Sequence, residues 1–149
     1  MHSPTLLHVD IVTKSIEKSV EFYSKYLKYS VVEDTKVISP AAMFLSNNQT
    51  DSMRLVFLKR NNRSPMIELI QFLDSSGKEL ILDDGFNLNL SLSFLVNDVP
   101  DSISELSNDG LLPVSDIFKI ELINLGTTRI VFYQDPDGHL IEMISAFNS

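Results

Sequence analysis

The chain repeats one structural unit along its length. Three segments of the first half recur in the second: residues 8–20 as 91–103, 54–57 as 129–132, and 66–70 as 140–144. Each copy has the pattern of a strand, a helix and further strands, and one copy alone would leave a sheet face uncovered. We therefore expect one domain, residues 1–149, of the α+β class, with two modules that enclose a shared cavity.

Hydrophobic periodicity divides each copy into elements. The first copy contains a strand at 6–12, a helix from an N-cap at Ser15 to about Tyr26, and strand-like runs at 29–33, 41–45, 53–59 and 66–72. The second contains a strand at 90–96, a helix capped by Asp98 that stops at Gly110, and strands at 117–122, 128–134 and 140–146. Module one thus spans 5–72 and module two 89–147, with a linker at 73–88 that lacks a clean period.

Charge and cysteine content exclude several classes of function. The net charge of −8 argues against a nucleic acid as partner, because Lys and Arg drive that binding. Without cysteines, disulfides, thiolate metal sites and cysteine nucleophiles are excluded. No apolar run is long enough to span a membrane, and the first residues lack a targeting pattern, so we expect a soluble cytoplasmic protein.

Polar side chains share one face of the first predicted strand. Successive side chains on a strand point to opposite faces, so His8 and Asp10 lie together and the apolar residues of 6–12 face the helix. Ser91 and Ser93 are their counterparts in the second copy. The predicted cavity therefore has a polar contribution from each module.

Two glutamates interrupt matching apolar strands. Glu68 and Glu142 each stand between apolar residues, where an ionised carboxylate is costly unless something pairs with it. The repeat brings both glutamates near His8 and Ser91, and two neighbouring carboxylates share a proton or bind a cation. An imidazole and two carboxylates suit Zn, Ni, Co, Mn or Fe. We therefore expect a divalent metal.

Simpler interpretations exist for some of these residues. Glu68 and Glu142 could instead form salt bridges with Arg54 and Arg129 on the neighbouring strands. His139 should point away from Glu142 if its strand is regular, which makes it a turn residue in solvent. A neutral hydroxyl is a poor metal ligand, so we expect Ser91 to leave room for a ligand or to hold a water.

The chain also resembles a known family, the vicinal oxygen chelate superfamily. That family includes glyoxalase I, methylmalonyl-CoA epimerase, extradiol dioxygenases, fosfomycin-modifying enzymes and bleomycin-resistance binders. The resemblance covers nearly all of residues 5–146, and its most specific parts are His8 with 19–27, 94–98 and 135–142. It implies two βαβββ modules that pair into a half-open β-barrel, and a homodimer.

The resemblance also implies roles for individual residues. His8, Glu68 and Glu142 match the metal ligands, whereas Ser91 stands where the second module usually has a His. Glu68 or Glu142 would also be catalytic, moving a proton. Lys28 replaces the Gly that usually follows the first helix, a departure that concerns the turn. The predicted substrate pocket is largely apolar, as small-molecule sites are, and is formed by Asp10, Met66, Ile70, Phe72, Ser91, Ser93 and Ile144.

The function implied is that of a metal-dependent small-molecule enzyme of the isomerase or lyase type, similar to glyoxalase I or methylmalonyl-CoA epimerase. A divalent metal would stabilise an enediolate by binding two neighbouring oxygens. A second hypothesis is a metal-free protein that binds a drug or natural product, as the bleomycin-resistance branch does. A third is an Fe(II) dioxygenase, which the missing second His disfavours.

Overall fold

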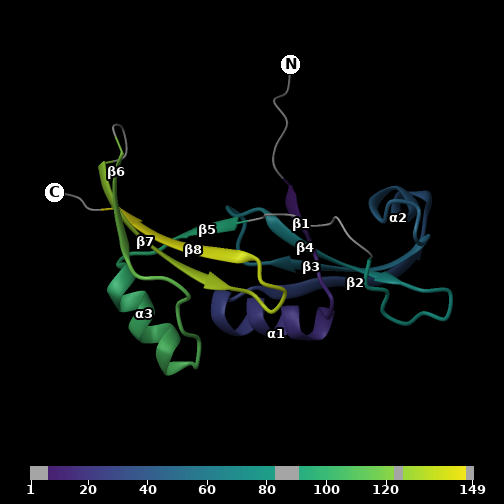
Figure 1. Cartoon of the computed structure of the whole chain (residues 1–149), viewed down its shortest axis with the longest axis horizontal. Coiled ribbons are helices and arrows are strands. Elements are labelled where there is room, and N and C mark those ends of the chain that lie inside the picture. The colour runs from purple at the N-terminus through teal and green to yellow at the C-terminus, as the bar shows by residue number, and fades with distance from the viewer. Residues whose placement is uncertain (1–6, 83–90, 123–125, 147–149) are drawn as a thin grey trace, which may run out of the picture. The chain divides into compact units, whose positions relative to one another are not determined.

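The computed structural model describes residues 7–82, 91–122 and 126–146, which belong to two compact units. Unit one lies within residues 1–88 and unit two within 89–149. Each unit contains a four-stranded sheet with one parallel pair of strands and two antiparallel pairs (Figure 1). The α+β class and the two βαβββ modules are confirmed. Pairing of the sheets into a half-open barrel stays a prediction.

Unit one forms its sheet in the order β1-β4-β3-β2. Its elements are β1 (His8–Val12), α1 (Ile16–Leu27), β2 (Ser30–Ile38), α2 (Pro40–Leu45), β3 (Ser52–Lys59) and β4 (Met66–Leu73). β1 and β4 run parallel, with His8 opposite Met66 and Asp10 opposite Glu68. α1 and α2 lie on opposite sides of this sheet (Figure 1).

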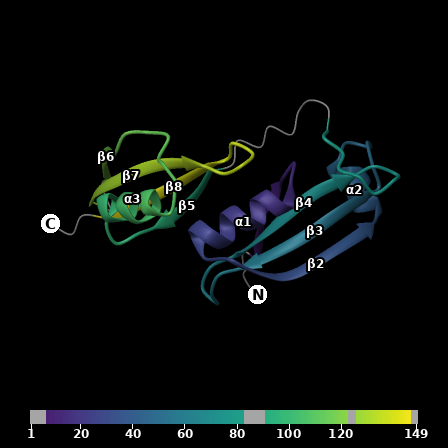
Figure 2. The ribbon, with the colours of Figure 1, turned by 90° about the horizontal axis from the view of Figure 1, so that it is seen from below.

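Helix α1 covers one face of the sheet of unit one (Figure 2). The Ser15 side chain caps it by accepting a hydrogen bond from the Lys18 N–H, as predicted. Its buried stripe of Ile16, Phe22, Tyr23 and Leu27 covers the fully buried side chains of that sheet face, among them Ile11, Leu58 and Leu69. Lys28 ends the helix at φ 61°, the left-handed conformation for which Gly is the usual residue.

The opposite face carries a second hydrophobic cluster, formed by Ala42, Met53, Ile70 and Phe72. Ala42 comes from α2, so the strand predicted at 41–45 is wrong. Ser39 is an N-cap whose side chain accepts from the Ala41 N–H, and Pro40 occupies the first turn. A proline there costs nothing, because that N–H has no partner within a helix. The Ser-Pro pair therefore starts a helix despite the apolar run that follows.

Unit two repeats the arrangement in the order β5-β8-β7-β6. Its elements are β5 (Ser91–Leu95), α3 (Val99–Asn108), β6 (Phe118–Leu122), β7 (Gly126–Gln134) and β8 (Leu140–Ala146). Asp98 caps α3 as predicted by accepting from the Asp101 N–H, and Gly110 follows its end at φ +94°. β5 runs parallel to β8, with Ser93 opposite Glu142. The internal repeat is thus confirmed at the level of topology and register.

Two predicted boundaries differ from the structure. β2 is longer than the predicted 29–33. The sequence pattern missed its second part because the side chains of β2 are exposed almost throughout, so they show no alternation of buried and exposed residues. Part of the predicted linker, 83–88, lies outside the described residues, whereas Leu80 and Leu82 pack against the hydrophobic cluster beside α2. Among the described residues, every helix is too short or too polar to cross a membrane.

Candidate metal-binding site

His8, Asp10 and Glu68 converge on the face of unit one opposite α1. The parallel pairing of β1 with β4 places Asp10 directly across from Glu68, and His8 shares the same face by alternation. His8 Nε2 lies 3.0 Å from Asp10 Oδ1 and 2.9 Å from Glu68 Oε2. The shared face of these residues agrees with the alternation along the strands. Sequence analysis did not predict that Asp10 contacts His8 and Glu68. The feature that could have indicated this contact is a carboxylate two residues after His8, on the same face of the strand.

Burial makes it costly for Glu68 to carry a negative charge beside Asp10. Glu68 is 8% exposed, and the rings of His8 and Phe57 form a T-shaped contact with centroids 5.5 Å apart. Desolvation, and then the hydrogen bond with Asp10 and its negative charge, raise the pKa of Glu68 to about 7. Two carboxylates so close together cannot both ionise cheaply without a compensating positive charge.

The donor set fits a divalent cation. One ligand atom from each of His8, Asp10 and Glu68 can be chosen so that all three lie within 4.8 Å of one another. His8 Nδ1 is buried and has no hydrogen-bond partner, while Nε2 faces both carboxylates. An imidazole nitrogen and two carboxylate oxygens are the ligands that Zn²⁺ and related metals accept.

Glu142 lies in unit two in the equivalent strand position. Ser93 Oγ donates a hydrogen bond of 2.8 Å to Glu142 Oε1, which mirrors the pairing of Asp10 with Glu68. The backbone of Ser91 pairs with Leu140, and its side chain is outside the described part of the structure. The predicted joining of Glu142 and Ser91 to the His8 cluster stays a prediction.

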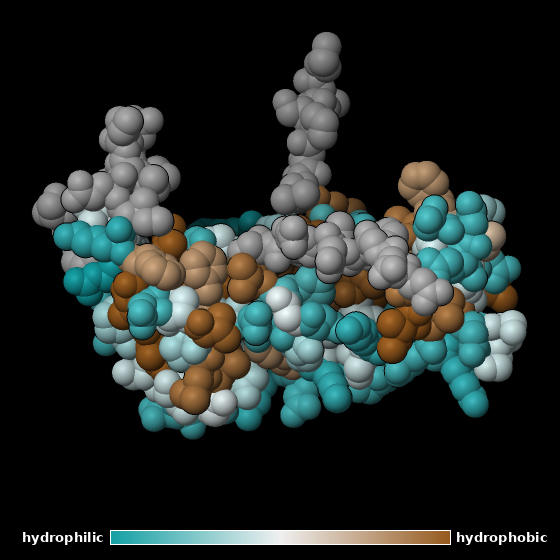
Figure 3. Space-filling model, viewed as in Figure 1, coloured by the Kyte–Doolittle hydropathy of each residue, from teal (hydrophilic) through white to brown (hydrophobic). Residues whose placement is uncertain are grey.

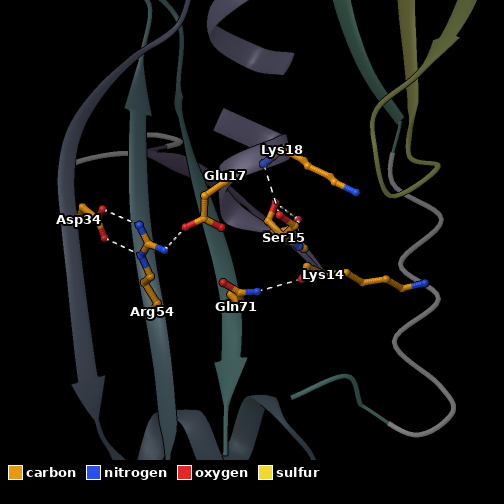
Figure 4. Close-up of polar contacts among 8 residues, drawn as sticks. Lys14, Ser15, Glu17, Lys18, Asp34, Arg54 and Gln71 are labelled. Atoms are coloured by element: carbon orange, nitrogen blue, oxygen red, sulfur yellow. Dashed lines mark hydrogen bonds and ion pairs between the residues drawn. The ribbon is translucent and has the colours of Figure 1, made fainter. Parts of the chain in front are cut away.

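The alternative salt bridge between Glu68 and Arg54 is wrong. Arg54 donates from Nε and Nη2 to the Asp34 carboxylate, at 2.9 Å each, and from Nη1 to Glu17 Oε1 at 2.6 Å (Figure 4). Glu17 belongs to α1, so Arg54 points to the helix side of the sheet, away from Glu68. The sequence could not show this, because the competing carboxylates come from a helix and a neighbouring strand.

The corresponding alternative in unit two is also disfavoured by strand register. Arg129 pairs with Ser145, whereas Phe132 pairs with Glu142. Positions an odd number of residues apart on one strand lie on opposite faces, so Arg129 and Glu142 point away from each other.

The Arg54 contacts predict a pH-dependent loss of stability in Arg54→Gln. Hydrogen bonds from Arg54 hold the pKa values of Glu17 and Asp34 below their ordinary 4.5 and 3.8. Depressed carboxyl pKa values stabilise the fold above the unfolded pKa, and this stability is lost as pH falls through the folded values. We expect the variant to be about 1 kcal/mol less stable at neutral pH, a modest figure because both carboxylates are largely exposed. Urea unfolding should show this difference shrinking below about pH 4, and a difference independent of pH would contradict the assignment.

The predicted pocket residues occupy different environments. Ile70 and Phe72 are 2% and 1% exposed and lie in the hydrophobic cluster beside α2. Met66 and Ile144 are half-buried, and Met66 pairs with His8 across β1 and β4. Their role in a substrate pocket stays a prediction.

A cavity of about 480 Å³ occurs elsewhere, around Arg54, and is lined by Lys36, Arg54, Gln71, Leu73, Gly77, Lys78 and Glu79.

His139 is not the solvent-exposed turn residue that was predicted. Its side chain is 13% exposed, and Nδ1 lies 2.7 Å from Oδ2 of the buried Asp135. Asp135 Oδ1 also accepts from the backbone N–H groups of Asp137 and His139, which closes the turn between β7 and β8. The hydrogen bond with Asp135 raises the pKa of His139. This cluster is explained by turn structure, since each contact serves the reversal.

Comparison with known proteins agrees with this fold. A family model described as the Glyoxalase/Bleomycin resistance protein/Dioxygenase superfamily matches residues 5–143. No curated protein shows a significant sequence match to the chain.

Several solved structures share the fold. A glyoxalase family protein from Bacillus cereus is 18% identical with a TM-score of 0.68, covering 99% of each chain. A protein from the mobile metagenome of V. Pseudocholerae is 21% identical with a TM-score of 0.64, covering 99% of this chain and 98% of that one. The trypanothione-dependent glyoxalase I of Leishmania major is 20% identical with a TM-score of 0.58, covering 96% and 87%.

Proposed function

Because the chain belongs to the Glyoxalase/Bleomycin resistance protein/Dioxygenase superfamily, we propose that it is a metal-dependent enzyme of the isomerase or lyase type acting on a small molecule. The superfamily includes enzymes such as glyoxalase I, one of which shares the fold. The observation that supports the proposal is the convergence of His8, Asp10 and Glu68, where one imidazole nitrogen meets two carboxylates within 3.0 Å.

In this proposal His8 and Glu68 hold the cation, and Glu142 contributes a ligand from the second module. The cation is Zn, Ni, Co, Mn or Fe, all of which accept imidazole and carboxylate ligands. When bound, the cation would act as a Lewis acid toward two neighbouring oxygens of the substrate.

In this reaction a carboxylate of the site would take a proton from the substrate and return it at another position. Glu68 and Glu142 are the two candidates, since each lies on a strand face beside a polar partner, Asp10 or Ser93. Ser93 donates to Glu142 and so orients its carboxylate for transfer. The ring of Phe57 packs against that of His8 and gives the site an apolar side.

Ser91 favours a second candidate function, that of a metal-free protein binding a drug or natural product. Ser stands where the second module of metal-binding relatives usually has a His, and a neutral hydroxyl is a weak ligand. A protein of this kind should carry no stoichiometric metal, and its ligand affinity should survive Glu142→Gln.

We further propose that the chain forms a homodimer. Hydrophobic residues reach the surface on the face shown in Figure 3. Unit two exposes several large apolar side chains in the segment after α3 and at the start of β6. They are Leu112, Val114, Ile117 and Phe118, which are 42–67% exposed. Large apolar side chains exposed on a surface are common where subunits meet.

Binding of a ligand with two adjacent oxygens tests the proposed chemistry. The probe is acetohydroxamate, added to the protein loaded with Co²⁺, with acetamide as the single-oxygen control. We expect acetohydroxamate, but not acetamide, to bind and to change the visible absorption of the cobalt, because open positions accept two oxygens together. Failure of acetohydroxamate to bind the cobalt-loaded protein would contradict the proposal.

A further inference from the structure

The two modules differ at the strand position opposite the glutamate that occurs in both copies of the repeat. In unit one this position is Asp10, across from Glu68, and in unit two it is Ser93, across from Glu142. Ser93 donates a hydrogen bond to its glutamate, which a carboxylate such as Asp10 can do only when protonated. Asp10 therefore adds a negative charge to the cluster that the second module lacks.

Asp10 contacts the same ring nitrogen of His8 as Glu68 does. Its Oδ1 lies 3.0 Å from Nε2, and Glu68 Oε2 lies 2.9 Å from that atom. A carboxylate that merely orients a metal-binding imidazole contacts the opposite ring nitrogen. In His8 that opposite nitrogen, Nδ1, is buried and has no hydrogen-bond partner. Asp10 thus lies on the side of the ring where a cation would bind.

Exposure of the cluster increases from Glu68 to Asp10. The Glu68 side chain is 11% exposed, that of His8 28% and that of Asp10 47%. Glu68 is thus the most buried carboxylate of the cluster, and Asp10 is the one most accessible to solvent.

We propose that Asp10 is a direct ligand of the divalent cation, so that unit one alone supplies three ligands: His8, Asp10 and Glu68. This inference rests on the metal dependence proposed above. It accounts for Ser91, because the carboxylate of Asp10 replaces the ligand that the second module lacks. It also leaves Glu142 less important for holding the cation.

Competition for Zn²⁺ against a chromophoric chelator tests this inference on the full chain. Two variants remove the carboxylate: Asp10→Asn, which keeps its size, and Asp10→Ser, which copies the residue found at Ser93. We expect each to weaken Zn²⁺ binding about 100-fold. The matched control is Asp51→Asn, since Asp51 is an exposed carboxylate outside the cluster, and its affinity should equal that of the wild type.

Cobalt spectra separate a ligand from a neighbour that only supports one. With Co²⁺ in excess, loss of a ligand should change the visible bands in both Asp10 variants, whereas unchanged bands would overturn the inference. Wild-type affinity for Zn²⁺ in both variants would also overturn it and leave the proposed metal dependence intact. A wild-type protein that binds no Zn²⁺ would overturn both.

Discussion

Glu68→Gln is expected to weaken the binding of Zn²⁺ about 100-fold. A structural zinc site with four ligands is worth about 10–16 kcal/mol, so one ligand contributes about 3 kcal/mol, or two factors of ten. Glu68 is the most buried member of the cluster, and Gln keeps its size while removing the charge. The measurement is the dissociation constant of Zn²⁺, with Glu21→Gln on the exposed side of α1 as the matched control.

Without metal, the same substitution should increase the stability of the fold at alkaline pH. The pKa of Glu68 is raised from 4.5 to about 7 by burial and by Asp10. A raised pKa favours the fold below the unfolded value, and that stability is lost as pH rises through the folded value. Metal-free Glu68→Gln should therefore be more stable than the wild type at about pH 8. If it binds Zn²⁺ as tightly as the wild type, Glu68 is not a ligand.

Phe72→Ala should lower the free energy of unfolding by about 3–5 kcal/mol and the melting temperature by about 10 °C. The Phe72 side chain is 1% exposed in the cluster with Ala42, Met53 and Ile70, so its removal leaves a cavity under α2. Thermal and urea unfolding measure the loss.

Phe44→Ala is the matched control for Phe72. Phe44 is also in unit one, on α2, but is 84% exposed, so the same change should alter stability by less than about 0.5 kcal/mol. Equal effects of the two substitutions would contradict the placement of Phe72 in the hydrophobic core.

The repeat explains why so much of the fold could be predicted. A strand-helix-strands pattern that occurs twice defines the α+β modules, and alternation along β1 and β4 places His8 and Glu68 on one face. The caps at Ser15 and Asp98 followed from their side chains, which accept hydrogen bonds from the first turn.

Other features depend on contacts that a linear pattern does not contain. The helix that begins after Ser39 was predicted as a strand, because its apolar run is too short to show a period. Alternation placed Phe72 on the correct face but could not show that α2 packs against it. The partners of Arg54 and His139, which are Asp34 and Asp135, depend on register and on the geometry of a turn.

The metal content of the protein is the most direct test of the central claim. The full chain would be purified without chelators or affinity-tag metal and analysed for Zn, Ni, Co, Mn and Fe, together with His8→Ala. The account predicts about one divalent metal per chain in the wild type, with the metal lost in the variant. A wild-type protein that holds no metal, even after reconstitution with each of these ions, would contradict it and favour the metal-free binder.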